Sequence, residues 1–278
     1  MKLTLNFSPC PNDTYIFDAL VHHKVDTEGL EYEYYMADVE KLNGLAFAEE
    51  PDITKLSFHA FLHLVGRYLL LDSGAALGFG AGPLVVSKHL NNFQDLAGKT
   101  VAIPGVYTTA NLLFSLAMKQ AVQKKEFVFS EIENAILSGE VDAGVIIHES
   151  RFTYQSRGLL KLIDLGEYWE KLTGLPVPLG GIVAHNRLGT EVIAKVNRGI
   201  RRSVEYANAN KSGLNEFIRS NAQEMNESVM QQHIDLYVNE FSVNLGLKGR
   251  NAVIQMFEYA VQAGIIPAMP DPIFASGS

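Results

Sequence analysis

The sequence predicts an α/β protein built from two lobes, and three features of the chain indicate this fold. Residues 3–149 alternate short apolar strands with helices. Two similar apolar strands, 84–86 and 182–184, are interpreted as paired crossings between the lobes. From residue 190 onward the pattern is almost entirely helical. A repeated strand–loop–helix order predicts parallel sheets that are covered by helices on both faces.

The first segment opens with an apolar strand at 3–7, which runs into a cluster of small polar residues and prolines at 8–14. Helical periodicity follows at 14–22, where the apolar residues share one face. Open α/β folds place their ligands at such junctions, because free backbone N–H groups gather there. The later elements expected in this segment are strands at 30–36 and 52–56 and helices at 39–48 and 58–66.

The second segment repeats this order before the chain returns. We expect strands at 83–87, 100–103, 127–129 and 141–147, and helices at 111–123 and 131–138. Ser130 and Glu133 fit a capping box for the second of these helices. The helices expected after the return strand cover 190–208, 211–221, 228–237 and 250–263.

We expect residues 1–85 plus 185–278 to form the first lobe, which includes the C-terminal helices, and residues 86–184 to form the second. Two α/β lobes joined by two crossings, with a helical C-terminal segment, are typical of periplasmic-binding-protein-like folds. Such proteins hold a ligand in a cleft between the lobes and close around it by hinge motion.

Composition narrows the classes of partner. The chain has 278 residues, of which 47% are hydrophobic, and this is ample for two lobes. The net charge is −8 and the basic residues form no extended run, so nucleic acid is not an expected partner. No apolar run reaches the roughly 18 residues that span a bilayer, so we expect no membrane span. The partner we expect is an anionic small molecule, and a homodimer stays open.

Cysteine usage and the opening residues indicate the compartment. The single cysteine, Cys10, rules out an internal disulfide and argues against a thiolate metal cluster. The N-terminal stretch has no apolar signal core and no small-residue cleavage site, so we expect no signal peptide and a cytoplasmic location. The chain carries no P-loop, no GxGxxG after a strand and no GxSxG elbow. We therefore expect no nucleotide, flavin or metal cofactor.

Polar residues at the first two strand ends are candidates for substrate binding. These candidates are Asn12, Asp13, Thr14, Lys55, Leu56 and Ser57. The first three stand at the start of a helix, where they either cap the helix or hold hydroxyls or a carboxylate of a ligand. The other three end a strand, at the sheet edge that binds ligands in such folds. The alternative role of Ser57 is to cap the helix that follows it.

A third candidate is the start of the helix at 111–123. Thr108, Thr109 and Ala110 precede this helix and follow a Pro-Gly turn. Consecutive hydroxyls and free N–H groups at a helix start form an anion-binding cradle, which the helix dipole strengthens. Helix capping is the simpler alternative.

His148 is the candidate catalytic residue, because it directly follows the apolar strand at 141–147. Imidazole titrates near neutral pH, so it can take a proton from a substrate and return it. The alternative is an ordinary polar residue that starts a loop. His59 and His63 lie four residues apart on one helix, but they lack the HExxH pattern, so a zinc site is not expected.

Several motifs resemble those of one known family. The opening SPCPNDTYIF (8–17) resembles the N-terminal signature of the 1,4-dihydroxy-6-naphthoate synthases, which belong to the futalosine pathway of menaquinone (vitamin K2) biosynthesis. The resemblance continues in DITKLS (52–57), GAGPL (80–84), PGVYTTA (104–110) and DAGVIIHE (142–149), and it covers essentially the whole chain. It implies a type II periplasmic-binding-protein-like fold. It also implies a carbon–carbon lyase that converts cyclic dehypoxanthinylfutalosine to 1,4-dihydroxy-6-naphthoate without a metal or redox cofactor.

The resemblance also assigns roles to residues. The family's proton-accepting histidine falls on His148, and its substrate-binding strand end falls on residues 55–57. Its binding pair at a helix start falls within 108–110, with Thr109 and Ala110 as the preferred register. The hypothesis that follows is that His148 removes a proton and starts C–C fragmentation, while aromatisation of the product supplies driving force.

Two other functions stay open. Chorismate dehydratase of the same pathway has the same fold, although the opening motif argues against it. A non-catalytic solute-binding protein for small anions is not excluded by the fold alone, because one fold can host unrelated functions.

Overall fold

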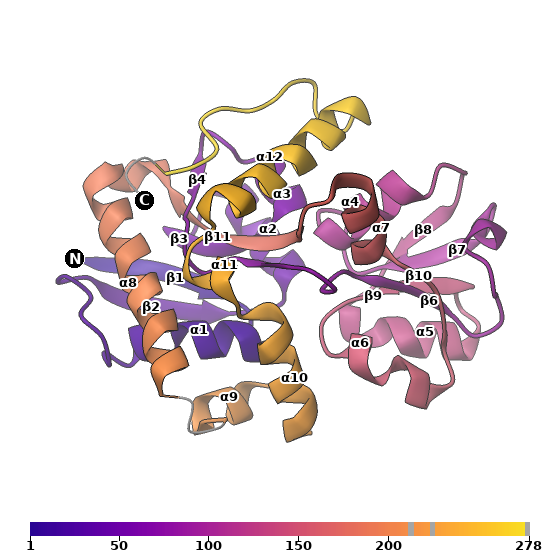
Figure 1. Ribbon diagram of the computed structural model, residues 1–278, viewed down its shortest axis with the longest axis horizontal. Coiled ribbons are helices and arrows are strands. Elements are labelled where there is room, and N and C mark those ends of the chain that lie inside the picture. Colours follow the sequence, from indigo (N-terminus) through magenta and orange to yellow (C-terminus); the bar gives the residue numbers. More distant parts are fainter. Residues whose placement is uncertain (211–213, 223–225, 276–278) are drawn as a thin grey trace. The chain divides into compact units, whose positions relative to one another are not determined.

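The structure is a computed structural model, and it describes residues 1–210, 214–222 and 226–275. The chain divides into two compact units (Figure 1). Unit 1 consists of Met1–Gly78 and Pro178–Ser278, and unit 2 consists of Phe79–Val177. The chain therefore leaves unit 1 once and returns to it once, a few residues before each of the expected boundaries.

The sheet of unit 1 is mixed rather than parallel, so the expectation of a parallel sheet is wrong here. Its strands are β1 (Lys2–Phe7), β2 (Glu31–Met36), β3 (Ile53–Ser57), β4 (Tyr68–Leu70), β5 (Ala76–Gly78) and β11 (Val177–His185). Their order is β2-β1-β3-β11-β4, and β5 pairs with β11. Strand β1 runs parallel to β2 and β3, whereas β11 runs antiparallel to β3 and β4.

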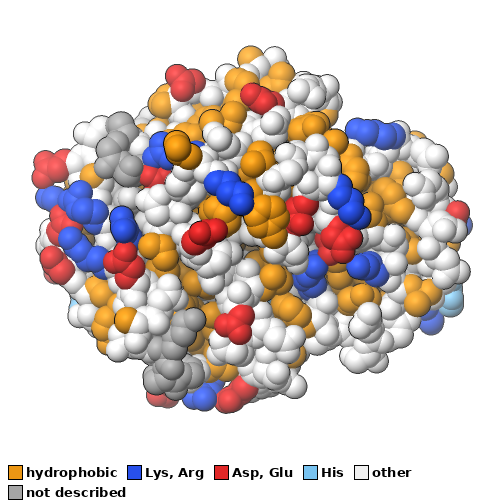
Figure 2. Space-filling model, in the orientation of Figure 1, with side chains coloured by type: hydrophobic (Ala, Val, Ile, Leu, Met, Phe, Trp, Pro, Cys, Tyr) orange, Lys and Arg blue, Asp and Glu red, His pale blue; other side chains and the backbone are white. Residues whose placement is uncertain are grey.

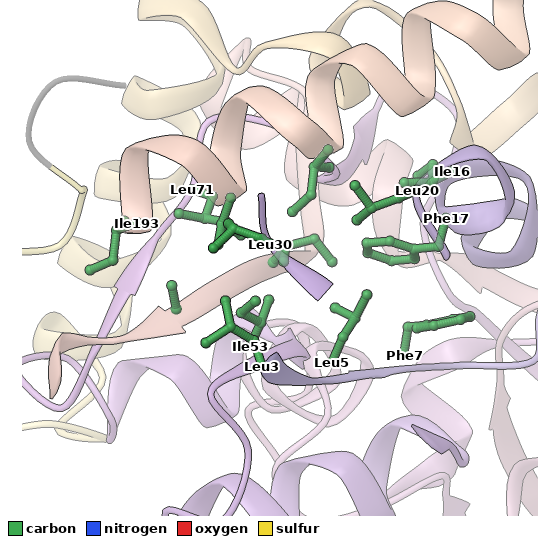
Figure 3. Packing of buried hydrophobic residues seen from close by; sticks show 14 of the residues in the cluster. Leu3, Leu5, Phe7, Ile16, Phe17, Leu20, Leu30, Ile53, Leu71 and Ile193 are labelled. Atoms are coloured by element: carbon green, nitrogen blue, oxygen red, sulfur yellow. The ribbon is translucent and has the colours of Figure 1, made fainter. Parts of the chain in front are cut away.

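Two helices cover one face of this sheet and enclose the core of unit 1. Helix α1 (Pro11–Val21) packs on α8 (Gly189–Ala209), and both bury apolar side chains against β1 (Figure 3). The core includes Leu3, Leu5, Phe7, Ile16, Phe17, Leu20, Ile193, Val196, Ile200 and Val204. Helices α2 (Val39–Phe47) and α3 (Phe58–Leu62) pack against β3. This packing holds α1 against the sheet that contains β1.

The C-terminal part of unit 1 is helical, as predicted. After α8 come α9 (Glu216–Asn221), α10 (Glu227–Tyr237), α11 (Glu240–Val243) and α12 (Gly246–Gln262). The helix expected at 211–221 is shorter, and its first residues, 211–213, lie outside the described residues. Both α9 and α10 pack against α1, so this segment reaches the same helix that starts after β1.

Unit 2 is built around a second mixed sheet. Its strands are β6 (Leu84–Ser87), β7 (Thr100–Ile103), β8 (Gln123–Glu126), β9 (Ala143–Ile146) and β10 (Leu160–Asp164), in the order β10-β6-β9-β7-β8. Strand β7 runs parallel to β8 and β9, whereas β6 runs antiparallel to β9 and β10. Its helices are α4 (Thr109–Ala117), α5 (Ile132–Ser138), α6 (Ser150–Thr153) and α7 (Leu165–Thr173). Short 3-10 turns lie at η1 (Phe93–Leu96), η2 (Phe129–Glu131) and η3 (Tyr154–Arg157), and a fourth, η4 (Asn186–Leu188), lies in unit 1.

Several local predictions are wrong. The strands at 84–86 and 182–184 are not the crossings between the units, since the first lies inside unit 2 and the second inside unit 1. The strand expected at 127–129 lies instead at β8, and the helix expected to reach residue 123 ends at Ala117. Every residue of β8 is exposed and polar, so this edge strand has no alternating apolar pattern. Helix α5 follows a 3-10 turn with Glu131 at its N-cap, so the capping box at Ser130 is also wrong.

Candidate active site

The predicted site residues of unit 1 lie at the carboxyl ends of two neighbouring parallel strands. Ser8 follows β1 directly, and Ser57 is the last residue of β3. Because β1 and β3 are parallel, their carboxyl ends meet at one sheet edge, the edge where α/β sheets bind ligands. Helix α1 begins at Pro11, three residues before the predicted start, because proline is well suited to the first helical position.

The first turn of α1 is buried rather than part of an open loop. Asn12, Asp13 and Thr14 are 6%, 1% and 0% exposed, respectively. The Thr14 hydroxyl lies 3.1 Å from the carbonyl oxygen of Cys10 and 3.2 Å from that of Pro11, so it bonds within its own helix. The side chains of Asn12 and Asp13 instead form the centre of a polar network.

Asp13 accepts hydrogen bonds on both carboxylate oxygens. Its Oδ2 atom accepts from the backbone N–H of Ser8 at 3.1 Å and from the Ser8 hydroxyl at 2.7 Å. Its Oδ1 atom accepts from Asn12 Nδ2 at 2.8 Å and from Lys55 Nζ at 2.7 Å. A buried charge is tolerated when it is paired and hydrogen-bonded, and this carboxylate meets both conditions.

Lys55 brings a buried cation to this edge. Its side chain is 7% exposed and forms an ion pair with Asp13. The Lys55 ammonium has three N–H donors, and among the described residues one of them is bound, by the Asp13 carboxylate. Two N–H donors are therefore left for a ligand. Leu56 points to the opposite face of the strand and is fully buried, so it offers a ligand only backbone atoms.

Ser57 is oriented by a residue that the sequence reading missed. Asn43 of α2 accepts a hydrogen bond from the backbone N–H of Ser57 at 3.1 Å and donates one to the Ser57 hydroxyl oxygen at 3.3 Å. Asn43 is itself held by Glu40 Oε2 at 2.9 Å. Because the Ser57 oxygen accepts from Asn43, its O–H is directed away from that amide. The Ser57 O–H is thus available as a hydrogen-bond donor to a ligand, as the Lys55 ammonium is.

A glycine of β11 allows the close approach of two strands next to Lys55. A Cβ atom placed on Gly180 would lie 2.8 Å from the backbone oxygen of Leu56 and 3.2 Å from Lys55 Cε. Both distances are shorter than ordinary contacts, so glycine is required here for steric reasons. The sequence predicted a strand only at 182–184, but β11 begins at Val177, so Gly180 lies within the strand.

The predicted site residues of unit 2 also lie after the carboxyl ends of two neighbouring parallel strands, which are β7 and β9. The loop at 104–110 follows β7, and His148 follows β9. Thr108 caps α4: its hydroxyl oxygen accepts from the backbone N–H of Asn111 at 3.2 Å and donates to the carbonyl of Gly105 at 2.8 Å. The predicted cap is therefore confirmed for Thr108, while the adjacent N–H groups lie at the positive end of the helix dipole.

Lys124 adds a positive charge near this helix start. Its Nζ atom donates to Asn111 Oδ1 at 2.7 Å and to Ser115 Oγ at 2.6 Å, and it lies 5.5 Å from the centre of the Phe114 ring. Although Lys124 as a whole residue is exposed, partial burial of its ammonium group lowers its pKa. The Asn111 amide also donates to the carbonyl of Val106 at 2.7 Å, so Lys124 and the loop before α4 are linked through one side chain.

His148 has an unusual backbone conformation. Its φ angle is +55°, in the left-handed region that residues other than glycine rarely adopt. The half-buried imidazole ring stands edge-on to Phe129, with the ring centres 4.8 Å apart. Strained residues of this kind cluster at functional sites, where the surrounding structure holds them. The observation supports a functional role for His148 beyond that of a polar loop residue.

Partly buried hydrogen bonds hold the segment that follows His148. Ser150 donates to Glu133 Oε2 at 3.3 Å, and Arg157 donates to the same oxygen at 3.0 Å. Glu133 is 5% exposed. Arg151 donates to the carbonyl of Gly82 at 2.5 Å and forms an ion pair with Asp164 at 2.6 Å. These contacts fix the turn that carries the imidazole.

A polar residue of the C-terminal helices also reaches the unit 1 site. His233 of α10 is 1% exposed, and its Nε2 atom lies 2.8 Å from Asn12 Oδ1. The predicted residues Asn12, Asp13 and Lys55 are thus brought together with His233 by direct hydrogen bonds. No local motif marks His233, because its partner lies far away in the sequence.

Elsewhere the surface charges are mixed. On the face shown in Figure 2, acidic and basic side chains are interspersed among apolar and uncharged ones. Many charged residues in the described part of the chain form ion pairs, such as Arg198 with Glu28 at 2.6 Å and Arg187 with Asp52 at 3.0 Å. Within the described part of the chain, none of the helices combines the length and apolar content needed to cross a membrane.

Two curated proteins are similar to this chain along almost its whole length. The chain is 44% identical over 272 residues to the 1,4-dihydroxy-6-naphtoate synthase of Thermus thermophilus, and the match covers 98% of each chain. It is 42% identical over 278 residues to the 1,4-dihydroxy-6-naphtoate synthase of Streptomyces coelicolor, covering 98% of this chain and 97% of the other.

Solved structures confirm the fold class. A crystal structure of an Archaeoglobus fulgidus protein superposes with a TM-score of 0.88 at 35% identity, covering 95% of this chain and 98% of that one. A Candida albicans protein described as having the generic periplasmic binding protein fold superposes with a TM-score of 0.70 at 13% identity, covering 98% and 92%. The alkanesulfonate-binding protein of Xanthomonas axonopodis gives 0.72 at 12% identity, covering 97% and 95%.

The family comparison agrees with the curated relatives. The sequence model described as menaquinone biosynthesis matches residues 3–262, which is most of the chain. Together with identities above 40% over nearly the full length, this match shows that the chain belongs to the menaquinone biosynthesis family.

Proposed function

We propose that this protein converts cyclic dehypoxanthinylfutalosine to 1,4-dihydroxy-6-naphthoate in menaquinone biosynthesis. The full-length similarity to two synthases that bear the product's name carries this proposal. The place of His148 after β9, at the carboxyl end of a strand that lies next to the parallel strand β7, also supports it.

We assign the proton-accepting role to His148. A neutral imidazole can remove a proton from the substrate, and the electron pair released from that C–H bond drives cleavage of a neighbouring C–C bond. The remaining ring becomes aromatic, while the departing fragment takes up a proton. A positioned general base contributes about 10²–10⁴-fold to the rate of such a step. This chemistry calls for no metal or redox cofactor, in line with the expectation from the sequence.

We assign substrate binding to both of the sheet edges described above. At the edge of unit 1, Lys55 and Ser57 present donors, which suit the carboxylate of an anionic substrate. At the edge of unit 2, the N–H groups of Thr109 and Ala110 at the start of α4 suit an anion or sugar hydroxyls. Leu56 and Thr108 contribute through the backbone. Contacts of the substrate with Asn12, Asp13 and Thr14 stay a prediction.

The experiment is to incubate the purified protein with cyclic dehypoxanthinylfutalosine, without added cofactor, and to follow the product by chromatography and mass spectrometry. The informative variant is His148→Asn, because asparagine tolerates the left-handed backbone but supplies no base. His89→Asn, an exposed histidine of the same unit, is the matched control. We expect a loss of about 10²–10⁴-fold in kcat for the first variant and no change for the second.

Other outcomes would identify other functions. Full turnover by His148→Asn would refute the assignment of the base while leaving the reaction in place. Recovery of unchanged substrate from the wild-type protein would refute the reaction, and chorismate would then be the next substrate to test, followed by a small-anion binding assay. For a biosynthetic enzyme of this kind we also propose a cytoplasmic location, which cell fractionation tests.

A further inference from the structure

We infer that His233 is a positioning residue that holds Lys55 in place through Asn12 and Asp13. The inference rests on the proposed function, in which Lys55 binds the substrate. His233 is buried, and its ring packs on Tyr237 of the same helix, with the ring centres 4.6 Å apart. The residue therefore acts on the substrate only through its neighbours.

The polarity of the hydrogen bonds fixes the direction of the network. The Asp13 carboxylate can only accept, so the Asn12 amide must direct its Nδ2 donors toward Asp13 Oδ1, which lies 2.8 Å away. The Asn12 carbonyl oxygen then faces His233, and the 2.8 Å contact requires an N–H on His233 Nε2. The donors run from His233 to Asn12 and from Asn12 to Asp13.

This chain of donors ends on the same oxygen that binds the lysine. Asp13 Oδ1 accepts from Asn12 and from Lys55, while Oδ2 is held by Ser8. The carboxylate is thus oriented from two sides, and its position sets that of the Lys55 ammonium. All of these groups are less than 10% exposed, so the hydrogen bonds act in a medium of low dielectric constant, where they are strong.

Loss of His233 would leave the buried Asn12 oxygen without its donor. An unsatisfied buried acceptor costs about 1–3 kcal/mol, so the amide would turn or shift to recover a partner. Either movement removes the Asn12 donor from Asp13 and loosens the ion pair with Lys55. The expected effect is weaker substrate binding with less change in the chemical step, since His148 is untouched.

The test compares His233→Leu, which removes the donor, with His233→Gln, whose amide nitrogen reaches the same position as Nε2. We expect KM to rise about ten-fold or more in His233→Leu, which corresponds to the loss of one buried hydrogen bond. His233→Gln should restore KM to near the wild-type value. The control is His185→Leu, a buried histidine at the end of β11 whose Nε2 atom contacts Glu49 at 3.2 Å; it should lower stability without raising KM.

A measurement without turnover separates this inference from the proposed function. The Lys55 ammonium, which is buried and paired with Asp13, should give a slowly exchanging ¹H–¹⁵N NMR signal in the wild-type protein. We expect that signal to be lost in folded His233→Leu and regained in His233→Gln. An unchanged Lys55 signal in both variants, or a wild-type KM for His233→Leu, would overturn the inference. Absence of turnover by the wild-type protein would instead overturn the proposed function, and the NMR comparison would still decide the role of His233.

Discussion

The left-handed backbone of His148 makes a quantitative prediction about stability. At φ = +55°, a residue with a Cβ atom is less stable than in the right-handed region by about 1–2 kcal/mol, and glycine escapes this cost. Glycine loses about 0.5–1 kcal/mol more on folding, because its unfolded chain is freer. His148→Gly and His148→Ala both lose the ring contact with Phe129, so that loss cancels between them. We therefore expect His148→Gly to be the more stable of the two by about 0.5–1 kcal/mol.

The assay is urea unfolding followed by tryptophan fluorescence. The chain has one tryptophan, Trp169, which is fully buried in unit 2, so its emission reports on the unit that contains His148. The matched control is Lys171 in α7, whose side chain is 79% exposed and whose backbone is helical. At that position alanine should be the more stable variant by about 1 kcal/mol, so the order of the two substitutions reverses. A His148→Ala variant as stable as His148→Gly would refute the claim of backbone strain.

Three further predictions concern unit 1. The hydrogen bond with Arg198 is the main cause that lowers the pKa of Glu28 from its ordinary value of 4.5 to about 2. A carboxyl group with a lowered pKa in the folded state stabilises that state at pH values above its unfolded pKa, so stability should fall as the pH drops from 4.5 to 2. A Glu28→Gln variant should lack this part of the acid transition in calorimetry. Gly180→Ala should destabilise the protein by about 1–3 kcal/mol and raise KM, because its Cβ would meet the Leu56 oxygen at 2.8 Å; an unchanged melting temperature and KM would contradict this account. Burial raises the pKa of Tyr32, and its hydroxyl has no hydrogen-bond partner among the described residues. Tyr32→Phe should therefore unfold at an equal or higher temperature, with a free energy of unfolding that rises by up to about 1 kcal/mol. A clear loss of stability would show that the hydroxyl has a hydrogen-bond partner in the folded protein.

The sequence was a good guide to the elements whose patterns are local. Strands β1, β2 and β7 and helices α8 and α10 fall close to the predicted ranges, because the pattern that predicts each of them is contained within its own segment. The direction of the strands was harder to predict. Antiparallel pairing of β11 with β3, and of β6 with β9, depends on contacts between distant segments, and no local pattern encodes it. The strand β10 and helix α7 lie in a region where no prediction was made.

The candidate site was predictable where a residue follows a strand. Lys55 and Ser57 lie in the last part of β3 and His148 lies just after β9, so all three are near the carboxyl end of a strand, and the family resemblance points to the same positions. The supporting residues were not predictable, since Asn43 and His233 are polar side chains on helices and resemble surface residues in the sequence. Their role depends on burial, and burial is a property of the folded chain: Asn43 is 0% exposed and His233 is 1% exposed. Gly180 likewise resembles a turn residue, although its role is to allow the close approach of two strands.

The division of the chain sets an order for folding during synthesis. Unit 2 is one continuous segment, Phe79–Val177, inserted between the two parts of unit 1. The central strand β11 of unit 1 leaves the ribosome only after all of unit 2 has been made, at about 5–20 residues per second. Until then β3 lacks the neighbour that covers one of its edges. Several seconds of synthesis therefore pass in which unit 2 can fold alone while the first half of unit 1 waits as an incomplete sheet, open to pairing with other chains.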